Sequence, residues 1–445
     1  TGIPACVIVL DKEGADERKH IFMIDASKGF IKDGNKNRLR EQDIHKIVDV
    51  FTKQTDVPKY SRLVSIEEIS DPKNDYNLNI PRYIDSQETE DIQDIEAHLL
   101  GGIPNADIEA LNEYWEVYPS LKAELFNASE RENYSDLKIE KDQIKQTIFN
   151  HPEFTTFSKK MDEVFETWKT KNTQILKALV KGFKPKELVF RISEDILATY
   201  TGHALMNKYD VYQHLMNYWN DIMQDDCYYL SVEGWKAELT ITKQTKSVTE
   251  WDCDLVPKSL VIDRYFGVEA QYIATLEAEK ETIAAEISEL EEEHNTEEGL
   301  FADVPDKVNK GNVQKRLKAI DTPKLKTENA EEIKVLKAYL KLIDDQTAIN
   351  KKIKEALAEL DKKVIERYKT LTEDEIKQLV VDDKWMSVLE RDVKTEMERI
   401  SQRLTQRIKE LAERYETTLP QQNAEVASLE SKVTTHLQKI GFVWK

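Results

Sequence analysis

A run of basic side chains near the N-terminus is the clearest candidate for chemistry, because it stands in an acidic chain. The chain carries 64 Lys and Arg against 84 Asp and Glu, a net charge of −20, so its overall field repels a polyanion. Lys and Arg placed around a turn, here residues 33–35, can contact successive phosphates. The candidates for DNA contact are Lys28, Lys32, Lys36 and Arg38, with Arg40 completing the run. An ordinary solvated turn is the alternative, and a later basic stretch, residues 177–186, carries the same two interpretations.

The other reactive residue types form no recognisable site in the sequence. Cys6, Cys227 and Cys253 lie far apart, which argues against a disulfide scaffold or a cysteine zinc site and is typical of a reducing cytoplasm. His203 and His214 are spaced to share a helical face, but without a third ligand nearby we favour a packing role. P-loop, HExxH and GxSxG motifs are absent. We therefore predict no catalytic, cofactor-binding or metal-binding residue.

The basic run must be positioned by the elements around it. The apolar stretches Pro4–Leu10 and His20–Asp25 flank a polar turn and predict two largely buried strands paired as a hairpin. Apolar residues at helical spacing in residues 44–51 predict a covering helix, and a short strand follows at Arg62–Ile66. Since a domain rarely begins inside its core, we expect more of this domain to precede Thr1.

Residues 91–260 predict a helical domain. They combine helical periodicity with many aromatic residues, and Pro and Gly punctuate the stretch. A short β element is expected near Glu238–Ile241. The longest apolar run, Ala5–Leu10, is far too short to cross a bilayer, so no membrane is expected among the partners.

From residue 261 the apolar pattern becomes heptad-like. Residues 261–320 predict a helical hairpin with an acidic loop, and residues 321–445 predict long helices. A seven-residue series is formed by Leu336, Ile343, Asn350, Leu357, Val364 and Leu371, and the companion positions are Tyr339, Ile353 and Leu360. This series places Asn350 on the helical seam, where a single polar residue fixes the register of paired helices.

The last helices carry a narrow apolar stripe that could contact another protein. One long helix stops before Pro420, and a shorter one ends at Gly441. The candidates for partner contact are Leu404, Ile408, Leu411 and Leu437. Apolar stripes at this spacing usually form intramolecular core, and that alternative stays open.

Three N-terminal motifs resemble those of the modification subunits of type I restriction-modification systems, which are N6-adenine DNA methyltransferases. They occur in the order and spacing of that family, at Gly2–Lys12 (GIPACVIVLDK), Phe22–Lys28 (FMIDASK) and Asn74–Tyr83 (NDYNLNIPRY). Later segments resemble the C-terminal extension of the larger members, and they are residues 98–104, 257–262, 411–415 and 441–445. The chain is thus similar to the C-terminal half of a modification subunit.

This resemblance implies a fold that is mainly α with a small α/β part. The end of a Rossmann-like methyltransferase sheet would occupy residues 1–90, followed by a helical domain and long coiled-coil-like helices. The resemblance further implies methyl transfer from S-adenosylmethionine to adenine N6 by the parent protein, as part of phage defence in the cytoplasm. It implies a specificity subunit, a second modification subunit, a restriction subunit and DNA as partners, with the C-terminal helices serving assembly.

The sequence departs from an active methyltransferase in two respects. A glycine-rich strand-to-helix turn, which lets backbone approach S-adenosylmethionine, is absent. So is the Asn/Asp-Pro-Pro-aromatic motif that holds an extruded adenine, because residues 79–83 lack consecutive prolines and we interpret them as a structural loop. We predict that this chain alone neither binds the cofactor nor methylates DNA. A coiled-coil scaffold and a methyltransferase of another phage-defence system are the alternatives to a type I subunit.

Overall fold

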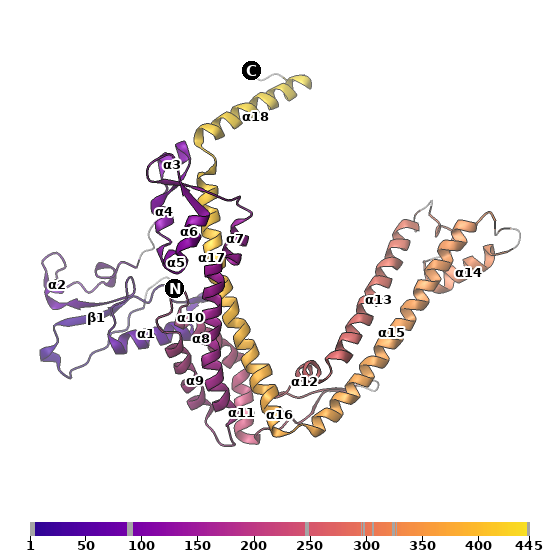
Figure 1. Cartoon of the computed structure of the whole chain (residues 1–445), viewed down its shortest axis with the longest axis horizontal. Helices are drawn as coiled ribbons and strands as arrows, with labels where there is room; N and C mark the ends of the chain where they lie inside the picture. Colours follow the sequence, from indigo (N-terminus) through magenta and orange to yellow (C-terminus); the bar gives the residue numbers. More distant parts are fainter. Residues whose placement is uncertain are drawn as a thin grey trace. The chain divides into compact units, whose positions relative to one another are not determined.

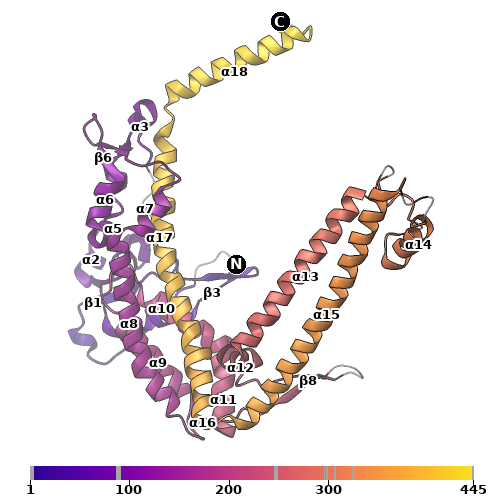
Figure 2. The ribbon, with the colours of Figure 1, turned by 45° about the vertical axis from the view of Figure 1, so that its right-hand side comes forward.

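The computed structural model describes residues 5–86, 92–244, 249–294, 296, 299–304, 307–322, 325 and 327–442. These residues form two compact units (Figures 1 and 2). The first comprises residues 1–231 and 385–445, and the second residues 232–384. Pro4 of the predicted first strand, parts of the acidic loop and residues 443–445 of the last family-like motif lie outside the described residues. No helix in the described ranges combines the length and apolarity that crossing a membrane requires.

The N-terminal region of the first unit is built on a two-stranded antiparallel sheet. Strand β1 (His20–Ile24) pairs with β4 (Ser61–Ser65), with Phe22 opposite Leu63. Its core consists of Met23, Val64, Ile69, Tyr83 and Ile84. The other elements of the region are η1 (Ala15–Glu17), β2 (Ile31–Asp33), β3 (Lys36–Arg38), α1 (Glu41–Lys53), α2 (Ile66–Ser70) and η2 (Ile80–Arg82). The expected helix over residues 44–51 and the strand over Arg62–Ile66 are therefore both present.

The predicted hairpin between Pro4–Leu10 and His20–Asp25 is wrong. Residues 5–10 form no strand, and Val7, Ile8, Val9 and Leu10 are 61 to 90% exposed. The second stretch does form a strand, but its partner is β4, forty residues further on. An apolar, β-branched run becomes a buried strand only where a sheet edge and a covering layer receive it. Among the described residues, nothing covers these four side chains.

The helical part of the first unit also contains a small sheet that periodicity did not predict. Three short strands, β5 (Ile103–Pro104), β7 (Tyr134–Leu137) and β6 (Phe126–Ala128), pair in that order. The helices around it are α3 (Ile95–Leu100), α4 (Asn105–Glu109), α5 (Asn112–Val117), α6 (Pro119–Leu125) and α7 (Ile144–Asn150). Larger helices follow as α8 (Pro152–Lys177), α9 (Pro185–Thr199), α10 (Lys208–Tyr218), the π-helical η3 (Trp219–Met223) and α11 (Gln224–Glu233). Strands of two to four residues are too short to show alternation in a sequence.

Helix α17 (Ser387–Glu416) runs through this unit and contacts α3, α7, α8 and α10. Leu404, Ile408 and Leu411 on α17 are completely buried, so the stripe predicted for a partner is core of this chain. The shorter α18 (Leu419–Lys439) follows after a capping box between Thr418 and Gln421. Leu437 lies on α18 and remains partly exposed.

The second unit is dominated by a helical hairpin. Helices α13 (Gly267–His294) and α15 (Ala330–Thr370) lie side by side, with α14 (Lys310–Ile320) packed at one end (Figure 2). One shared core contains Ile287, Phe301, Val313, Leu336 and Tyr339. The smaller elements are β8 (Thr240–Gln244), β9 (Thr249–Asp252), α12 (Lys258–Tyr265), α16 (Glu373–Lys377) and the π-helical η4 (Gln378–Met386), which crosses the boundary between the units.

The seven-residue series of α15 does not stay on the buried face. Asn350 and Leu357 are exposed, whereas the neighbouring Ile349, Ile353 and Leu360 are buried. Leu336 and Val364 of the same series are completely buried, so the series leaves the buried face only in the middle of the helix. The predicted seam position of Asn350 is therefore wrong.

Candidate nucleic-acid interface

The predicted basic run forms an exposed hairpin beside helix α1. Strands β2 and β3 pair antiparallel with Asp33 opposite Lys36, and Gly34 takes a φ of +58° at the first central position of the turn. A two-residue hairpin turn of this kind favours glycine there, because a Cβ is disfavoured at positive φ. The side chains of Lys28, Lys32, Lys36 and Arg38 are all exposed. The structure thus brings the four candidates together on one short segment.

The charges on this hairpin are only lightly engaged. Lys32 donates to the side-chain oxygen of Asn37 at 2.7 Å, a neutral partner that leaves its positive charge uncompensated. Arg38 lies 3.2 Å from Asp33, but both side chains are more than 60% exposed, and such a pair contributes little. Both side chains can exchange these partners for a phosphate at small cost.

A cavity of about 220 Å³ lies beneath the start of this segment. It is bounded by the turn at residues 26–29, the first two turns of α1, Tyr60 of the loop before β4, and the start of α10. Gly29 makes this close approach possible, because a Cβ there would sit 2.9 Å from a carboxylate oxygen of Asp43. The sequence FMIDASKGF therefore places Lys28 at the rim of an enclosed space.

The acid inside this cavity is neutralised locally. Arg40 donates from Nε and Nη2 to the two oxygens of Asp43, both at 2.9 Å. The backbone N–H of Arg40 also donates to this carboxylate. Burial alone would raise the pKa of Asp43, but these hydrogen bonds outweigh it and hold the pKa below its usual range. The pair closes the capping box at the start of α1.

Charged contacts dock α1 against α10. Asp49 accepts hydrogen bonds from the Tyr209 hydroxyl at 2.6 Å and the Lys208 ammonium at 3.0 Å, and it also pairs with Lys53. Gln42 donates from its backbone to Gln213 at 3.0 Å. Burial would raise the pKa of Asp49, but the three donors lower it well below its usual range.

The same network continues into α17. Gln42 donates to one oxygen of Asp210 at 2.9 Å, and Arg399 donates to the other at 3.1 Å. Arg399 also pairs with Glu396, a carboxylate that is only 4% exposed and lies 3.4 Å from His214. The N-terminal region is thereby hydrogen-bonded to the helix that organises the rest of the unit.

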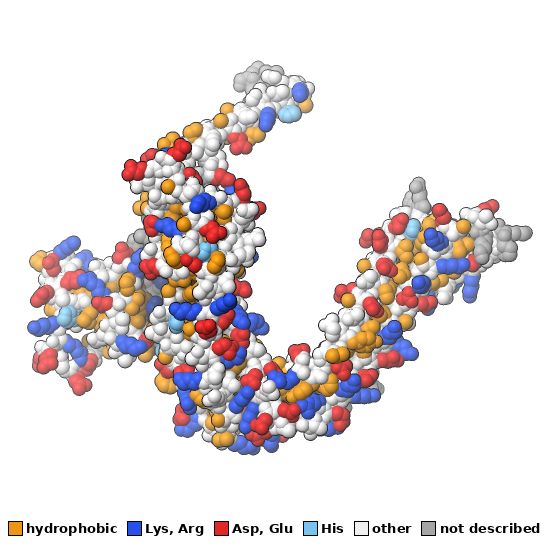
Figure 3. Space-filling model, viewed as in Figure 1, with side chains coloured by type: hydrophobic (Ala, Val, Ile, Leu, Met, Phe, Trp, Pro, Cys, Tyr) orange, Lys and Arg blue, Asp and Glu red, His pale blue; other side chains and the backbone are white. Residues whose placement is uncertain are grey.

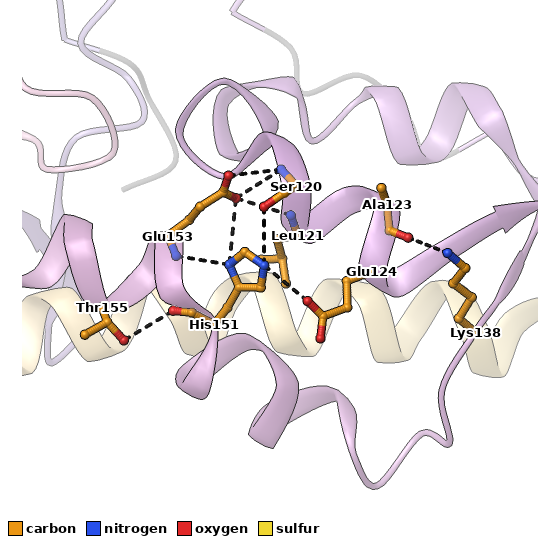
Figure 4. A network of polar contacts seen from close by, with 8 residues as sticks. All are labelled: Ser120, Leu121, Ala123, Glu124, Lys138, His151, Glu153 and Thr155. Carbon is orange, nitrogen blue, oxygen red and sulfur yellow. Dashed lines mark hydrogen bonds and ion pairs between the residues drawn. The ribbon is translucent and has the colours of Figure 1, made fainter.

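A second polar cluster, around His151, serves to cap helices (Figure 4). His151 Nδ1 accepts from the backbone of Glu153 at the start of α8, while the Glu153 carboxylate accepts from the backbones of Ser120 and Leu121 at the start of α6. Its Nε2 faces Glu124 at 3.2 Å and the Ser120 hydroxyl at 3.5 Å. A Ser-His-acid triad needs the acid on the nitrogen opposite the serine. Here Glu124 and Ser120 share Nε2. The Glu153 carboxylate is 3.7 Å from Nδ1, too far for a hydrogen bond, and Nδ1 already accepts a backbone N–H, so the arrangement is structural.

Several cavity residues were not singled out from the sequence, namely Lys46, Tyr60, Asn207 and Tyr209. Lys46 lies one helical turn after Gln42 and Asp43, so helical spacing alone could have placed it on the same face. The residues of α10 are about 160 positions away along the chain, and no local pattern indicates that contact. The basic stretch at residues 177–186 lies elsewhere on the unit, where Lys184 pairs with Glu187. No group of three potential metal ligands occurs in the described ranges.

Comparison with known proteins agrees with the N-terminal motifs. Residues 1–92 match the sequence profile of the family described as N-6 DNA Methylase. The type I restriction enzyme MjaVII methylase subunit of Methanocaldococcus jannaschii is 45% identical over 94 residues, or 20% of this chain and 16% of that protein. The MjaVIII methylase subunit of the same organism is 35% identical over 127 residues, 27% and 21% of the two chains. The MpnII methylase subunit of Mycoplasma pneumoniae is 26% identical over 129 residues, 28% and 23%.

The N-terminal region of this chain is therefore similar to the N-6 DNA methylase family. Its curated relatives are methylase subunits of type I restriction enzymes, and the matched segments span about a sixth to a quarter of their length. No solved structure matches the chain significantly. The family profile ends at residue 92, so the resemblance of the later segments stays a prediction.

Proposed function

We propose that this chain belongs to the modification subunit of a type I restriction-modification system, in which it positions DNA and joins partner subunits. The whole subunit would transfer a methyl group from S-adenosylmethionine to adenine N6. The observation that carries the proposal is the family match over residues 1–92, which includes the exposed basic hairpin.

The described residues do not fit the cofactor that the family implies. The cavity beside the hairpin is lined by Lys28, Arg40 and Lys46, whose positive charges oppose the cationic sulfonium of S-adenosylmethionine. The described residues also contain no glycine-rich turn after a strand. We assign these residues no part in methyl transfer and give them the role of holding DNA.

The hairpin would hold DNA through its phosphates. The hairpin carries three cations within seven residues, with Lys36 and Arg38 on one face and Lys32 on the other, and their exposure leaves them free to exchange water for phosphate. Contacts of this kind set the register of a protein on a duplex without reading its sequence. Sequence choice would then belong to the specificity subunit.

Helix α18 would provide the surface for assembly. Val426, Leu429 and Val433 are each more than half exposed and recur at helical spacing with Leu437 (Figure 3). An exposed apolar stripe at helical spacing supports this proposal, because amphipathic helices bind partners through such a face. The partner we propose is the specificity subunit.

The DNA-binding role is tested by charge reversal in the full chain. The triple variant Lys32→Glu, Lys36→Glu, Arg38→Glu should weaken binding of a fluorescent duplex at least about 100-fold at fixed salt, since it replaces three attractive phosphate contacts by repulsion. The matched control, Lys177→Glu, Lys181→Glu, Lys186→Glu, changes the net charge equally in the second basic stretch. Equal losses in the two triple variants would contradict a localised site on the hairpin.

The assembly role is tested by co-purification with the specificity subunit. The double variant Leu429→Asp, Val433→Asp should abolish co-purification and leave the melting temperature of the chain alone unchanged. Ser428→Asp, Ser431→Asp adds the same charge to the opposite face of α18 and should retain the partner, because residues two or five positions from the stripe point away from it. Retention of the partner by both variants would contradict the proposed surface.

A further inference from the structure

Two lysine ammonium groups share the cavity beside the hairpin, and neither has an ion-pair partner among the described residues. Lys28 lies exposed at the rim, and Lys46 projects from α1 and is only partly exposed. Lys46 Nζ lies 4.0 Å from the centre of the Tyr60 ring, which attracts the cation but cannot neutralise it. Burial accordingly lowers the pKa of Lys46, although Asp210 and Asp43 pull the other way.

The two acids closest to Lys46 are already engaged by other donors. Both oxygens of Asp43 are occupied by Arg40, and both oxygens of Asp210 are occupied by Gln42 and Arg399. An unpaired, partly desolvated ammonium is unfavourable in a folded protein unless a ligand compensates it. This is unusual in a chain that has twenty more acids than bases.

A neighbouring cavity provides a comparison, because its charged side chains are all paired with one another. It measures about 300 Å³ and lies on the other side of α1. Its lysines, Lys53 and Lys208, both pair with Asp49, and its Glu194 lies 2.7 Å from His45. Cations and anions therefore compensate each other there, whereas the cavity at Lys46 is left with positive charge and neutral donors.

We propose that the cavity between Lys28 and Lys46 binds one phosphate group of a nucleic-acid backbone. Tyr60 and Asn207 also line it and carry neutral donors; burial raises the pKa of Tyr60 to about 12, so its hydroxyl keeps its proton. At about 220 Å³ the space is smaller than the pockets that enclose whole ligands, and it suits a phosphate rather than an extruded base with its sugar.

The site rests on the proposed DNA-binding function and adds a specific anchor to it. Lys46→Met in the full chain removes the charge and keeps the aliphatic stem over Tyr60. Lys145→Met is the matched control, because Lys145 likewise lies over an aromatic ring, 5.6 Å from the centre of Phe149, but is exposed and has no ion pair among the described residues. Both variants should melt like the unmodified chain. Binding of a fluorescent duplex is measured by anisotropy over a range of salt concentrations.

Lys46→Met should weaken duplex binding about tenfold and reduce the slope of log K against log salt by about one, as expected for one lost phosphate contact. Lys145→Met should change neither quantity, and Lys46→Arg should restore both. If the duplex binds and the two Met variants behave alike, the phosphate site is wrong while the DNA-binding function stands. If the unmodified chain binds no duplex, that function fails, and inorganic phosphate becomes the probe. Stabilisation of the unmodified chain by phosphate, lost in Lys46→Met, would retain a site for free phosphate, and its absence would overturn the site.

Discussion

Helices α17 and α18 carry similar apolar stripes, but the stripe of α17 is buried and that of α18 is exposed. In α17, Leu404, Ile408 and Leu411 are completely buried against helices of the same unit. In α18, no described residue is buried, and Leu429 and Val433 are about half exposed. Only two residues, Thr417 and Thr418, separate the helices. Apolar periodicity therefore predicts that a helix has an apolar face. It does not predict whether that face packs within the chain or stays exposed.

The two helices also differ in the polar groups on their stripes. Helix α17 buries Glu396, which meets Arg399 and His214 and so joins the network that reaches α1. Helix α18 contacts α3, and none of its described residues is buried. A helix that anchors several others needs such fixed contacts.

The largest expected effect comes from charging the α17 stripe. Leu404→Asp with Leu411→Asp would bury two unpaired carboxylates and leave two cavities, so we expect a loss of more than about 5 kcal/mol and an unfolded first unit. Leu429→Asp with Val433→Asp on α18 should cost less than about 0.5 kcal/mol in the chain alone. Chemical denaturation followed by circular dichroism measures both. Similar losses of stability in the two double variants would contradict the difference in burial between α17 and α18.

A smaller effect is expected from the buried acid of α17. Glu396→Ala removes a buried carboxylate that meets Arg399 and His214, while Arg399 keeps Asp210, and breaking this partly buried pair should cost about 3 kcal/mol. Glu425→Ala on the exposed α18 provides the matched control and should leave the free energy of unfolding unchanged, because Glu425 is solvent-exposed. A loss below about 1 kcal/mol for Glu396→Ala would show that the network does not anchor α17.

The smallest of the three effects is the loss of stability at low pH that comes from Asp49. The folded-state pKa of Asp49 lies below its unfolded value of about 3.9, so its stabilisation is complete above that value and is lost as pH falls further. We expect about 2 kcal/mol less stability in the unmodified chain between pH 5 and the acid limit from this group, and a flatter profile in Asp49→Asn. The α17 stripe is apolar and contributes no such dependence. Equal pH profiles for the two proteins would contradict the polar docking of α1.

Much of the helical architecture could be predicted from the sequence, because a long amphipathic helix has a local apolar periodicity that the sequence shows directly. The stop before Pro420, the covering helix near Ile47 and the basic turn at Gly34 all follow from spacing and turn chemistry. The wrong N-terminal hairpin has another cause, which is that contacts with distant segments decide whether an apolar run becomes a buried strand. Residues 5–10 have the composition of a buried strand but lie exposed. Strand β1 pairs instead with β4, about forty residues further along the chain.

The candidate site divides in the same way. The cations of the hairpin are neighbours in sequence and could be identified from it. The cavity could not, because it needs α10 and the close approach of Gly29 to Asp43. The unpaired state of Lys46 depends on Arg40, Gln42 and Arg399 occupying the nearby acids, which no spacing rule indicates.

Hydrogen–deuterium exchange of the full chain tests the central comparison most directly. The amides around Leu404–Leu411 should be among the slowest to exchange, and those of residues 426–437 among the fastest helical amides. Addition of the specificity subunit should slow exchange in α18 and leave α17 unchanged. Equal protection of the two helices in the chain alone, or no protection of α18 on adding that subunit, would contradict the account.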